Sequence, residues 1–363
     1  IPGAAIAVVK DGELFFAQGY GVADTRSQRP VVADETLFHI GSITKLFTWT
    51  AVMQLVEEGI LDLHTDVNTY LADTDFQIPD TYPEPVTLHN LLTHTPGFED
   101  RIGNLYRISR YDAVPLPQYI REQLPARAYP PGEIIAYSNY GAALAGYIIQ
   151  ETSGLSYEQY IETHLLEPLQ MERSSIRHPL PASLAEDEAL GHLRILGDVG
   201  PIREYFPSAP LVGMSATVTD MANFMIAHLH EGEYEGARIL QPETARMMQR
   251  QQFTHDPRLT GVTYGFVEWD RNDQRMLWHG GSTALFQSII LLLPEHDVGL
   301  FVIYNKKSES EAGRELRQDF LDRYYPAESE PPQPMPDHET RVDLFTGTYR
   351  ESRWAHTTVD KLI

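Results

Sequence analysis

The sequence predicts an α+β fold in which both ends of the chain build one antiparallel sheet flanked by helices. Strand-like segments open the chain at residues 5–9 and 13–20, joined by Asp11-Gly12, a dipeptide typical of tight hairpins. Further strand-like segments occur late in the chain, at about 262–269, 275–279, 285–293 and 298–304. Between these two groups, helix and loop patterns dominate residues 42–260, so a mostly helical region is inserted into the sheet.

Local signals place several helix starts and the domain limits. Thr87 is the expected N-cap of a short helix, and Thr219 that of a helix over 220–230. An amphipathic pattern over 308–325 predicts a helix that closes the first domain. This domain spans residues 1–325, a proline-rich acidic linker follows at 326–340, and 341–363 is the start of a C-terminal β-rich segment. Residues 345–350 are its expected first strand. Either further sequence completes this segment, or the tail packs on the first domain.

Composition limits the classes of function. The formal net charge of −23 makes nucleic acid and anionic membrane surfaces poor partners. No apolar run approaches the ~20 residues of a membrane helix. Cysteine is absent, and the 14 histidines are scattered without metal-ligand spacing, so we expect neither a metal nor another cofactor.

Ser42 and Lys45 form the most informative motif, S-x-x-K, immediately before an apolar helical run. Residues three apart at a helix start lie on the same face, one turn apart. The helix N-terminus adds free N–H groups and the positive end of the helix dipole. The pair therefore suits a nucleophilic serine whose proton passes to lysine. An N-cap serine beside a solvated lysine is the structural alternative.

Two later segments add to this motif. Tyr137 and Asn139 follow a Pro-Pro-Gly turn at the start of a helical pattern, where a phenol can point into a cleft and move protons. Gly280 and Gly281 come directly after the strand-like segment that ends at His279, and glycine lets backbone approach a ligand closely. Taken singly, Tyr137 is better explained as a packing aromatic, and Gly280-Gly281 as a simple turn, than by a catalytic role.

In this order and spacing, the three segments resemble the serine β-lactamase and penicillin-binding-protein superfamily, whose motifs are S-x-x-K, Y-x-N and K-T-G or H-x-G. The similarity is strongest to its class C-like branch, which includes β-lactamases, DD-carboxypeptidases, D-aminopeptidases and family VIII-type esterases. The segment at 91–98, L-L-T-H-T-P-G-F, also looks like a loop of that family. The resemblance implies a β-lactamase/transpeptidase-like fold over residues 1–325.

The resemblance also implies roles for individual residues. Ser42 is the nucleophile, and Lys45 and Tyr137 share the roles of base and proton shuttle. The backbone N–H groups of Ser42 and Ser282 form the oxyanion hole. The remaining motif residues are Asn139, which hydrogen-bonds Lys45 or the substrate amide, His279 on the leaving-group side, and Gly280 and Gly281, which border the substrate.

The third motif separates the candidate activities. Histidine and glycine replace the lysine and threonine that help hold the substrate carboxylate in β-lactamases, so neutral or cationic acyl donors are expected. We therefore expect an esterase or D-amino-acid-type peptidase acting on small ester, amide or peptide substrates. The alternatives are a β-lactamase or DD-carboxypeptidase and, from another class, a non-catalytic binding module on the same fold. Relatives of this type act mostly at the cell envelope, so we expect an exported protein whose signal or anchor is not in this chain.

Overall fold

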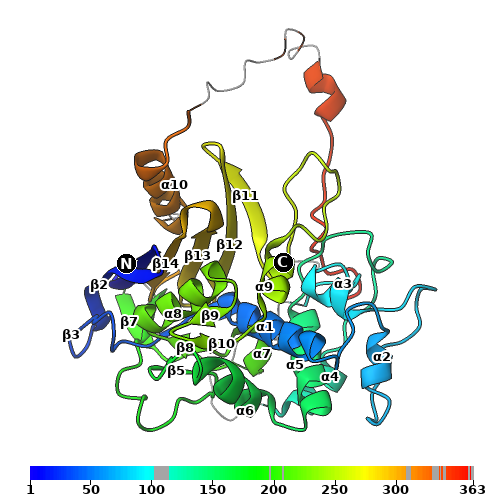
Figure 1. The fold of residues 1–363 in the computed structure, drawn as a ribbon, viewed down its shortest axis with the longest axis horizontal. Helices are drawn as coiled ribbons and strands as arrows, with labels where there is room; N and C mark the ends of the chain where they lie inside the picture. Colours follow the sequence, from blue (N-terminus) through cyan, green and yellow to red (C-terminus); the bar gives the residue numbers. More distant parts are fainter. Residues whose placement is uncertain are drawn as a thin grey trace.

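The computed structural model describes residues 1–101, 114–195, 198–206, 208–307, 312–328, 335, 337, 341–358 and 360. Its central element is a seven-stranded sheet in the order β11-β12-β13-β14-β1-β2-β3, with every neighbouring pair antiparallel (Figure 1). The strands are β1 Gly3–Lys10, β2 Glu13–Asp24, β3 Arg29–Pro30, β11 Val267–Arg271, β12 Gln274–Ser282, β13 Gln287–Leu293 and β14 Val298–Tyr304. Because β1 pairs with both β2 and β14, the two ends of the domain meet in one sheet, which confirms the predicted fold class.

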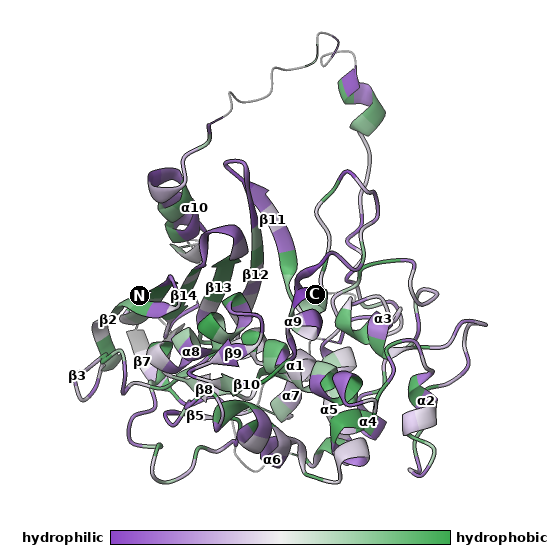
Figure 2. Cartoon of the chain, viewed as in Figure 1, coloured by the Kyte–Doolittle hydropathy of each residue, from purple (hydrophilic) through white to green (hydrophobic). Residues whose placement is uncertain are grey.

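The sheet is hydrophobic on both faces because helices cover both. Along β1, Ala5, Ala7 and Val9 belong to the main core, whereas Ile6 and Val8 face the opposite side of the sheet. On that opposite side they meet a smaller cluster that includes Leu321 of α10 (Ala312–Tyr324). Figure 2 shows hydrophobic residues running along the strands between these layers. A strand covered on both sides loses strict polar alternation, and β14 is buried along its whole length.

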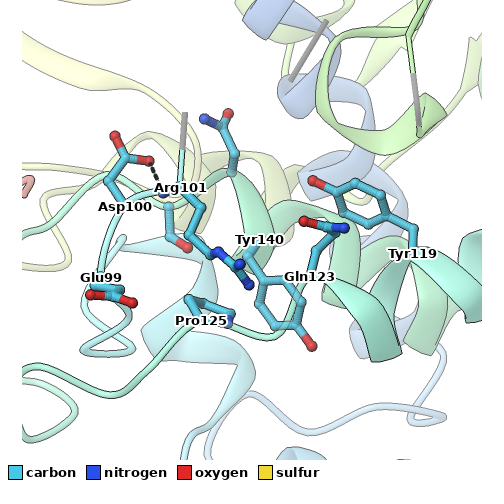
Figure 3. Close-up of a pocket in the computed structure, with 9 residues that line it drawn as sticks. Glu99, Asp100, Arg101, Tyr119, Gln123, Pro125 and Tyr140 are labelled. Carbon is cyan, nitrogen blue, oxygen red and sulfur yellow. Dashed lines mark hydrogen bonds between the residues drawn. The ribbon is translucent and has the colours of Figure 1, made fainter. Parts of the chain in front are cut away.

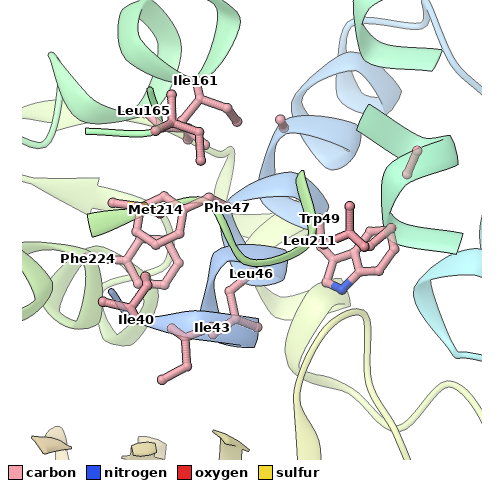
Figure 4. Close-up of a cluster of buried hydrophobic side chains, with 14 of the residues drawn as sticks. Ile40, Ile43, Leu46, Phe47, Trp49, Ile161, Leu165, Leu211, Met214 and Phe224 are labelled. Atoms are coloured by element: carbon pink, nitrogen blue, oxygen red, sulfur yellow. The ribbon is translucent and has the colours of Figure 1, made fainter. Parts of the chain in front are cut away.

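The main core surrounds α1 (Thr44–Glu57), whose side chains are buried from Thr44 to Leu55. Phe47 of α1 stacks on Phe224 of α8 with ring centroids 4.1 Å apart, in the cluster drawn in Figure 4. The other helices of the inserted region are α2 Val67–Tyr70, α3 Leu88–Leu92, α4 Leu116–Glu122, α5 Asn139–Ser153, α6 Tyr157–Ile161, α7 Ala209–Val212, α8 Val218–Leu229 and α9 Pro242–Gln249. A helix buried on all sides is held rigidly, so the residues at its start have fixed positions.

Short strands complete the inserted region. They form three small sheets: β4 (Phe38–His39) with β8 (Ser215–Ala216) and β5 (Ser174–Ser175), β6 (Gly191–Ile195) with β7 (Asp198–Ile202), and β9 (Glu233–Tyr234) with β10 (Ala237–Arg238). The first of these holds the chain just before α1 against the segment that follows α7, because His39 pairs with Ser215.

Two expected boundaries differ from the structure. Thr217, not Thr219, is the N-cap of α8, because its backbone is extended and its side chain accepts a hydrogen bond from Asp220 N at 3.2 Å. Val262 makes only isolated bridges to Phe253 and Val267, residues 263–266 bend back with Thr263 Oγ1 accepting from Phe266 N at 3.1 Å, and β11 starts only at Val267. The N-cap at Thr87 is confirmed, with a full capping box.

The C-terminal segment also differs from expectation. Among the described residues, 345–350 contain no strand; a 3-10 helix occupies Val342–Phe345, and Phe345 and Tyr349 are 70% and 76% exposed. A strand forms when its backbone pairs with a neighbouring strand, and residues 345–350 pair with no strand of the described chain. Beyond them the chain contacts the helical region, which corresponds to the expected alternative that the tail packs on the first domain (Figure 1). Most of the expected linker at 326–340 lies outside the described residues, and the domain division stays a prediction.

Candidate active site

Ser42 lies at the junction between a short strand and a helix. Gly41 has φ +60°, a left-handed conformation that suits glycine, and it begins the 3-10 helix η1 (Gly41–Ile43). This turn continues into α1, which places Lys45 one turn after Ser42. Lys45 Nζ lies 3.1 Å from Ser42 Oγ and 2.9 Å from the carbonyl oxygen of Leu211 in α7. Ser42 and Lys45 are therefore in hydrogen-bond contact.

Lys45 is completely buried, and its surroundings favour the neutral amine. Burial lowers the pKa of Lys45 well below its usual value, and the nearby Arg353 guanidinium lowers it further, while Asp100 opposes this effect. In the described part of the chain no hydrogen bond joins Lys45 Nζ to Asn139; its two partners are Ser42 Oγ and the Leu211 carbonyl oxygen. A neutral amine beside a serine hydroxyl can accept its proton.

Tyr137 lies on the other side of Lys45, just before α5. Lys45 Nζ is 5.1 Å from the centroid of the Tyr137 ring. The next residue, Ser138, caps α5 by accepting a hydrogen bond from Gly141 N at 3.0 Å, which fixes the chain direction at Tyr137. The ring of His279 is 6.1 Å away from that of Tyr137, centroid to centroid. The structure thus brings side chains from all three motifs together.

The third motif lies within β12 rather than after it. Gly281 packs so tightly against the segment before Ser42 that a Cβ there would be 2.1 Å from both the Ile40 carbonyl oxygen and Ser288 Oγ. Ser288 Oγ itself donates to that carbonyl at 2.8 Å. A Cβ on Gly41 would in turn lie 2.8 Å from Ser282 N. These close contacts place the backbone N–H of Ser282 beside the start of η1, the position that an oxyanion hole requires.

His279 is buried and neutral near pH 7. Burial, with a contribution from the charge on Lys45, lowers the pKa of His279 to about 4. Its Nδ1 lies 2.9 Å from the Gly280 carbonyl oxygen, which can only accept, so Nδ1 carries the proton and Nε2 presents a lone pair. The histidine at this place therefore supplies no fixed positive charge, and Gly280 supplies no hydroxyl.

Asn139 is the first residue of α5 and lines a small crevice, together with Glu99, Asp100, Arg101, Tyr119, Gln123, Pro125, Ser138 and Tyr140 (Figure 3). The crevice encloses about 10 Å³, room for roughly one water molecule. Its acidic side includes Glu99 and Asp100, two adjacent carboxylates that are only 4% and 6% exposed. Asn139 thus lines a polar recess, two positions after Tyr137 in the chain.

Sequence reasoning missed His94, which packs directly on Tyr137. The two rings are 4.2 Å apart at their centroids, and Ser138 N donates to His94 Nδ1 at 3.2 Å. Burial lowers the pKa of His94 well below its usual value, and His279 and Lys45 lower it further whenever they are protonated. His94 therefore positions Tyr137 as a neutral ring. The loop at 91–98 was recognised as a family feature, but nothing in the sequence pairs its histidine with Tyr137.

A second constellation, Ser215, His39 and Glu188, has the composition of a catalytic triad. His39 Nδ1 lies 2.8 Å from Ser215 Oγ, and His39 Nε2 lies 3.0 Å from Glu188 Oε1. Ser215 is 0% exposed and sits inside the small β4–β8–β5 sheet, so no substrate can reach it. The hydrogen bond between His39 and Ser215 joins β4 to β8. We therefore interpret these three residues as a structural network.

The described residues contain no candidate metal site. They contain no group of three or more histidine, aspartate or glutamate side chains arranged to hold a metal ion. Within the same part of the chain, none of the helices has the length and apolar character needed to cross a bilayer.

A family model described as Beta-lactamase matches residues 1–322, which include every residue of the three motifs. The chain belongs to the beta-lactamase family. The match confirms the family that the three motifs resemble.

Individual relatives are distant. "Protein flp" of Staphylococcus aureus (strain MW2) is 28% identical over 318 residues, covering 85% of this chain and 60% of the relative. A beta-lactamase of Yersinia enterocolitica is 27% identical over 340 residues, covering 84% of this chain and 82% of the relative. The chain therefore spans about 60% of the length of the Staphylococcus proteins that it matches.

Solved structures support the fold. An octameric penicillin-binding protein homologue from Pyrococcus abyssi superposes with a TM-score of 0.71 at 28% identity, covering 85% of this chain and 70% of the other. A D-alanine carboxypeptidase AmpC from Burkholderia cenocepacia gives a TM-score of 0.72 at 23% identity, covering 89% and 94% of the two chains. At that identity the second likeness speaks for the fold alone.

Proposed function

We propose that this beta-lactamase-family hydrolase is an esterase or a D-amino-acid-type peptidase that works through an acyl-enzyme on Ser42. The observation that carries the proposal is the 3.1 Å contact between Ser42 Oγ and Lys45 Nζ, made by a lysine that is 0% exposed. Burial shifts the pKa of this lysine well below its usual value, so it acts as a base at a pH where ordinary lysines are protonated.

In the first step, Ser42 Oγ bonds to the carbonyl carbon of the substrate while its proton passes to Lys45. The carbonyl oxygen becomes an anion that accepts hydrogen bonds from the backbone N–H groups of Ser42 and Ser282. The bond to the leaving group then breaks, and the leaving alcohol or amine takes up the proton. Tyr137, whose ring lies 5.1 Å from Lys45 Nζ, is placed to relay that proton.

In the second step, water attacks the acyl carbon. The same groups remove a proton from the water and return one to Ser42 Oγ, which releases the acid and restores the enzyme. His279 is neutral at physiological pH because burial lowers its pKa to about 4, so it borders the site as an acceptor through Nε2. Asn139, buried at the start of α5, is available to the substrate amide.

The third motif supports ester or amide substrates over β-lactams, because His279 and Gly280 offer no fixed cation and no hydroxyl to a carboxylate. One observation favours the second candidate, a DD-carboxypeptidase or β-lactamase. Arg353 from the C-terminal segment lies 5.0 Å over the Tyr137 ring and brings a cation to the site from elsewhere.

A substrate panel tests the proposal: p-nitrophenyl esters, D- and L-amino-acid amides and a chromogenic cephalosporin, each with the wild-type chain and Ser42→Ala. We expect ester or D-amide turnover that disappears in Ser42→Ala, together with labelling of Ser42 by a fluorophosphonate. Labelling without turnover of any substrate would instead favour the binding module, and a cephalosporin as the best substrate would favour the second candidate.

A further inference from the structure

The C-terminal segment docks beside the catalytic groups through two buried carboxylates. Glu99 accepts hydrogen bonds from His356 N at 2.6 Å, Thr357 N at 2.7 Å and Thr357 Oγ1 at 2.5 Å. Burial raises the pKa of Glu99, but these bonds, led by that from the Thr357 side chain, outweigh burial and lower it overall. The Glu99 carboxylate therefore anchors the C-terminal segment by accepting two backbone hydrogen bonds and one side-chain hydrogen bond.

The neighbouring residue fixes the segment at a second point. Asp100 N donates to the Trp354 carbonyl oxygen at 3.1 Å, and Ser352 Oγ donates to the Ile135 carbonyl oxygen at 2.6 Å. The segment Ser352–Thr357, which we call the C-terminal arm, thus lies along the loop that ends at Tyr137.

The arm carries Arg353 into the site. The Arg353 guanidinium lies 5.0 Å over the Tyr137 ring, and its Nε is 2.6 Å from Asp100 Oδ2. Asp100 is 5% exposed in its side chain, and its other oxygen accepts from Arg101 N at 3.0 Å, so the carboxylate is held from both sides. Asp100 thus holds Nε through an ion pair rather than an aligned hydrogen bond, and among the described residues no hydrogen-bond acceptor is recorded for the two terminal nitrogens of Arg353. The side chain is 39% exposed and can be reached from solvent.

The guanidinium, rather than Asp100, faces the catalytic residues. Burial is the main cause that lowers the pKa of Lys45, and the charge of Arg353 is the second. Asp100 raises this pKa, but its effect is smaller than that of Arg353. Arg353 also contributes to lowering the pKa of His94, whose ring lies tilted against that of Tyr137. Since the guanidinium lies 5.0 Å over the Tyr137 ring and Asp100 N binds the Trp354 carbonyl oxygen, the positive end of the ion pair lies against Tyr137 and its negative end at the docking site of the arm.

We propose that Arg353 is a specificity-determining residue that binds a carboxylate on the substrate, close to the bond that Ser42 attacks. A guanidinium whose Nε is fixed by a buried aspartate presents its terminal nitrogens in a planar fork, the geometry that pairs with carboxylates. Arg353 would supply the cation that His279-Gly280 lacks. The substrate class is then acyl compounds with a carboxylate near the scissile bond, such as peptides or esters with a free C-terminal acid. The inference rests on the proposed acyl-enzyme function and reverses the preference for neutral or cationic donors that the third motif alone predicts.

The test compares two substrates that differ only in the carboxylate: the thioester of benzoyl-D-alanine with thioglycolate, and the same thioester with the methyl ester of thioglycolate. The measured quantity is the ratio of their kcat/KM values in the wild-type chain, Arg353→Gln and Arg353→Lys. We expect the wild type to favour the acid, Arg353→Gln to reduce the ratio by about tenfold to a hundredfold, and Arg353→Lys to lose less because it keeps the charge.

Arg350→Gln is the matched control. Arg350 belongs to the same segment, but its guanidinium lies over the Trp354 ring at 5.8 Å and not over Tyr137. This variant should keep the wild-type ratio. Thermal unfolding and labelling of Ser42 by a fluorophosphonate establish that each variant is folded with an intact nucleophile.

The outcomes separate this inference from the proposed function. Hydrolysis of both thioesters with the same ratio in wild type and Arg353→Gln would overturn the role of Arg353 and leave the proposed function standing. Faster turnover of both substrates in Arg353→Gln would mean that the arm obstructs the site, which also overturns it. If the wild type hydrolyses neither thioester nor any ester or amide of the panel, both proposals fail.

Discussion

Replacement of Gly281 by alanine tests the contact that would position the proposed oxyanion hole of Ser42 and Ser282. The new methyl group would lie 2.1 Å from the Ile40 carbonyl oxygen and from Ser288 Oγ. Non-bonded atoms are comfortable at about 3.5 Å, so each contact is short by about 1.4 Å. Ser288 can rotate away at the expense of its 2.8 Å bond to Ile40, but the carbonyl belongs to the backbone and can retreat only by moving the chain.

A backbone shift that relieves this clash would also move the groups expected to bind the oxyanion. Ile40 directly precedes Gly41 and Ser42, and Gly281 directly precedes Ser282, so separating the two segments by about 1 Å moves apart the two N–H groups that serve the oxyanion. A misplacement of about 1 Å costs about a hundredfold, and loss of one oxyanion donor about 10² to 10³ in kcat. We expect kcat of Gly281→Ala to fall by about 10² to 10³, with a smaller change in KM.

Gly280→Ala is the comparison variant. A Cβ on Gly280 meets only the Trp278 ring, at 3.3 Å from Cζ3, so a small ring movement accommodates it. Steady-state hydrolysis of a p-nitrophenyl ester, with active sites counted by fluorophosphonate, should show a loss at least tenfold smaller than in Gly281→Ala. A folded Gly281→Ala with kcat within about threefold of wild type would refute the reasoning.

Ser42→Ala should lose fluorophosphonate labelling and turnover together, and an adduct on another serine in mass spectrometry would contradict the assignment. Lys45→Ala and Tyr137→Phe should show non-additive losses of kcat/KM in the double variant if they form one proton relay; fully additive losses would mean that they act independently. Because burial lowers the pKa of His228 to about 4, the unfolded chain binds more protons than the folded one between about pH 6.5 and 4. The free energy of unfolding should therefore fall by about 3 kcal/mol through this residue as the pH drops across that window, and denaturant unfolding of His228→Gln at both ends should lack this part of the decrease.

The sequence predicts those parts of the fold that depend on local patterns. The hairpin at Asp11-Gly12, the capping box at Thr87 and the helix after Ser42 follow from residues within a few positions of one another. Boundaries shift where two candidates compete, as at Thr217 and Thr219, since both are N-cap residues and only the backbone decides.

The site was predictable where its residues fall in motifs with known spacing, and unpredictable where it depends on packing. His94 is 43 positions before Tyr137, and Arg353 is 216 positions after it, yet both lie against the same ring. No periodicity links them. The lowered pKa of Lys45 cannot be predicted from the sequence either, because it results from complete burial and from an arginine on the C-terminal arm. If Arg353 acts as proposed, the third motif alone predicts the wrong charge for the preferred substrate, because the cation that binds its carboxylate comes from the C-terminal arm.

The position of β1 between β2 and β14 has a consequence for biosynthesis. Ala4 pairs with Tyr20 on one side and with Tyr304 on the other, so half of the hydrogen bonds of this strand close a loop of about 300 residues. During translation the first hairpin can form early, but its second edge stays open until the ribosome has released β14. At about 5–20 residues per second, that delay lasts roughly 15–60 s, during which an apolar strand edge is available for pairing with other chains. Such long-range closure predicts slow folding, and the nascent chain should depend on protection of its first strand.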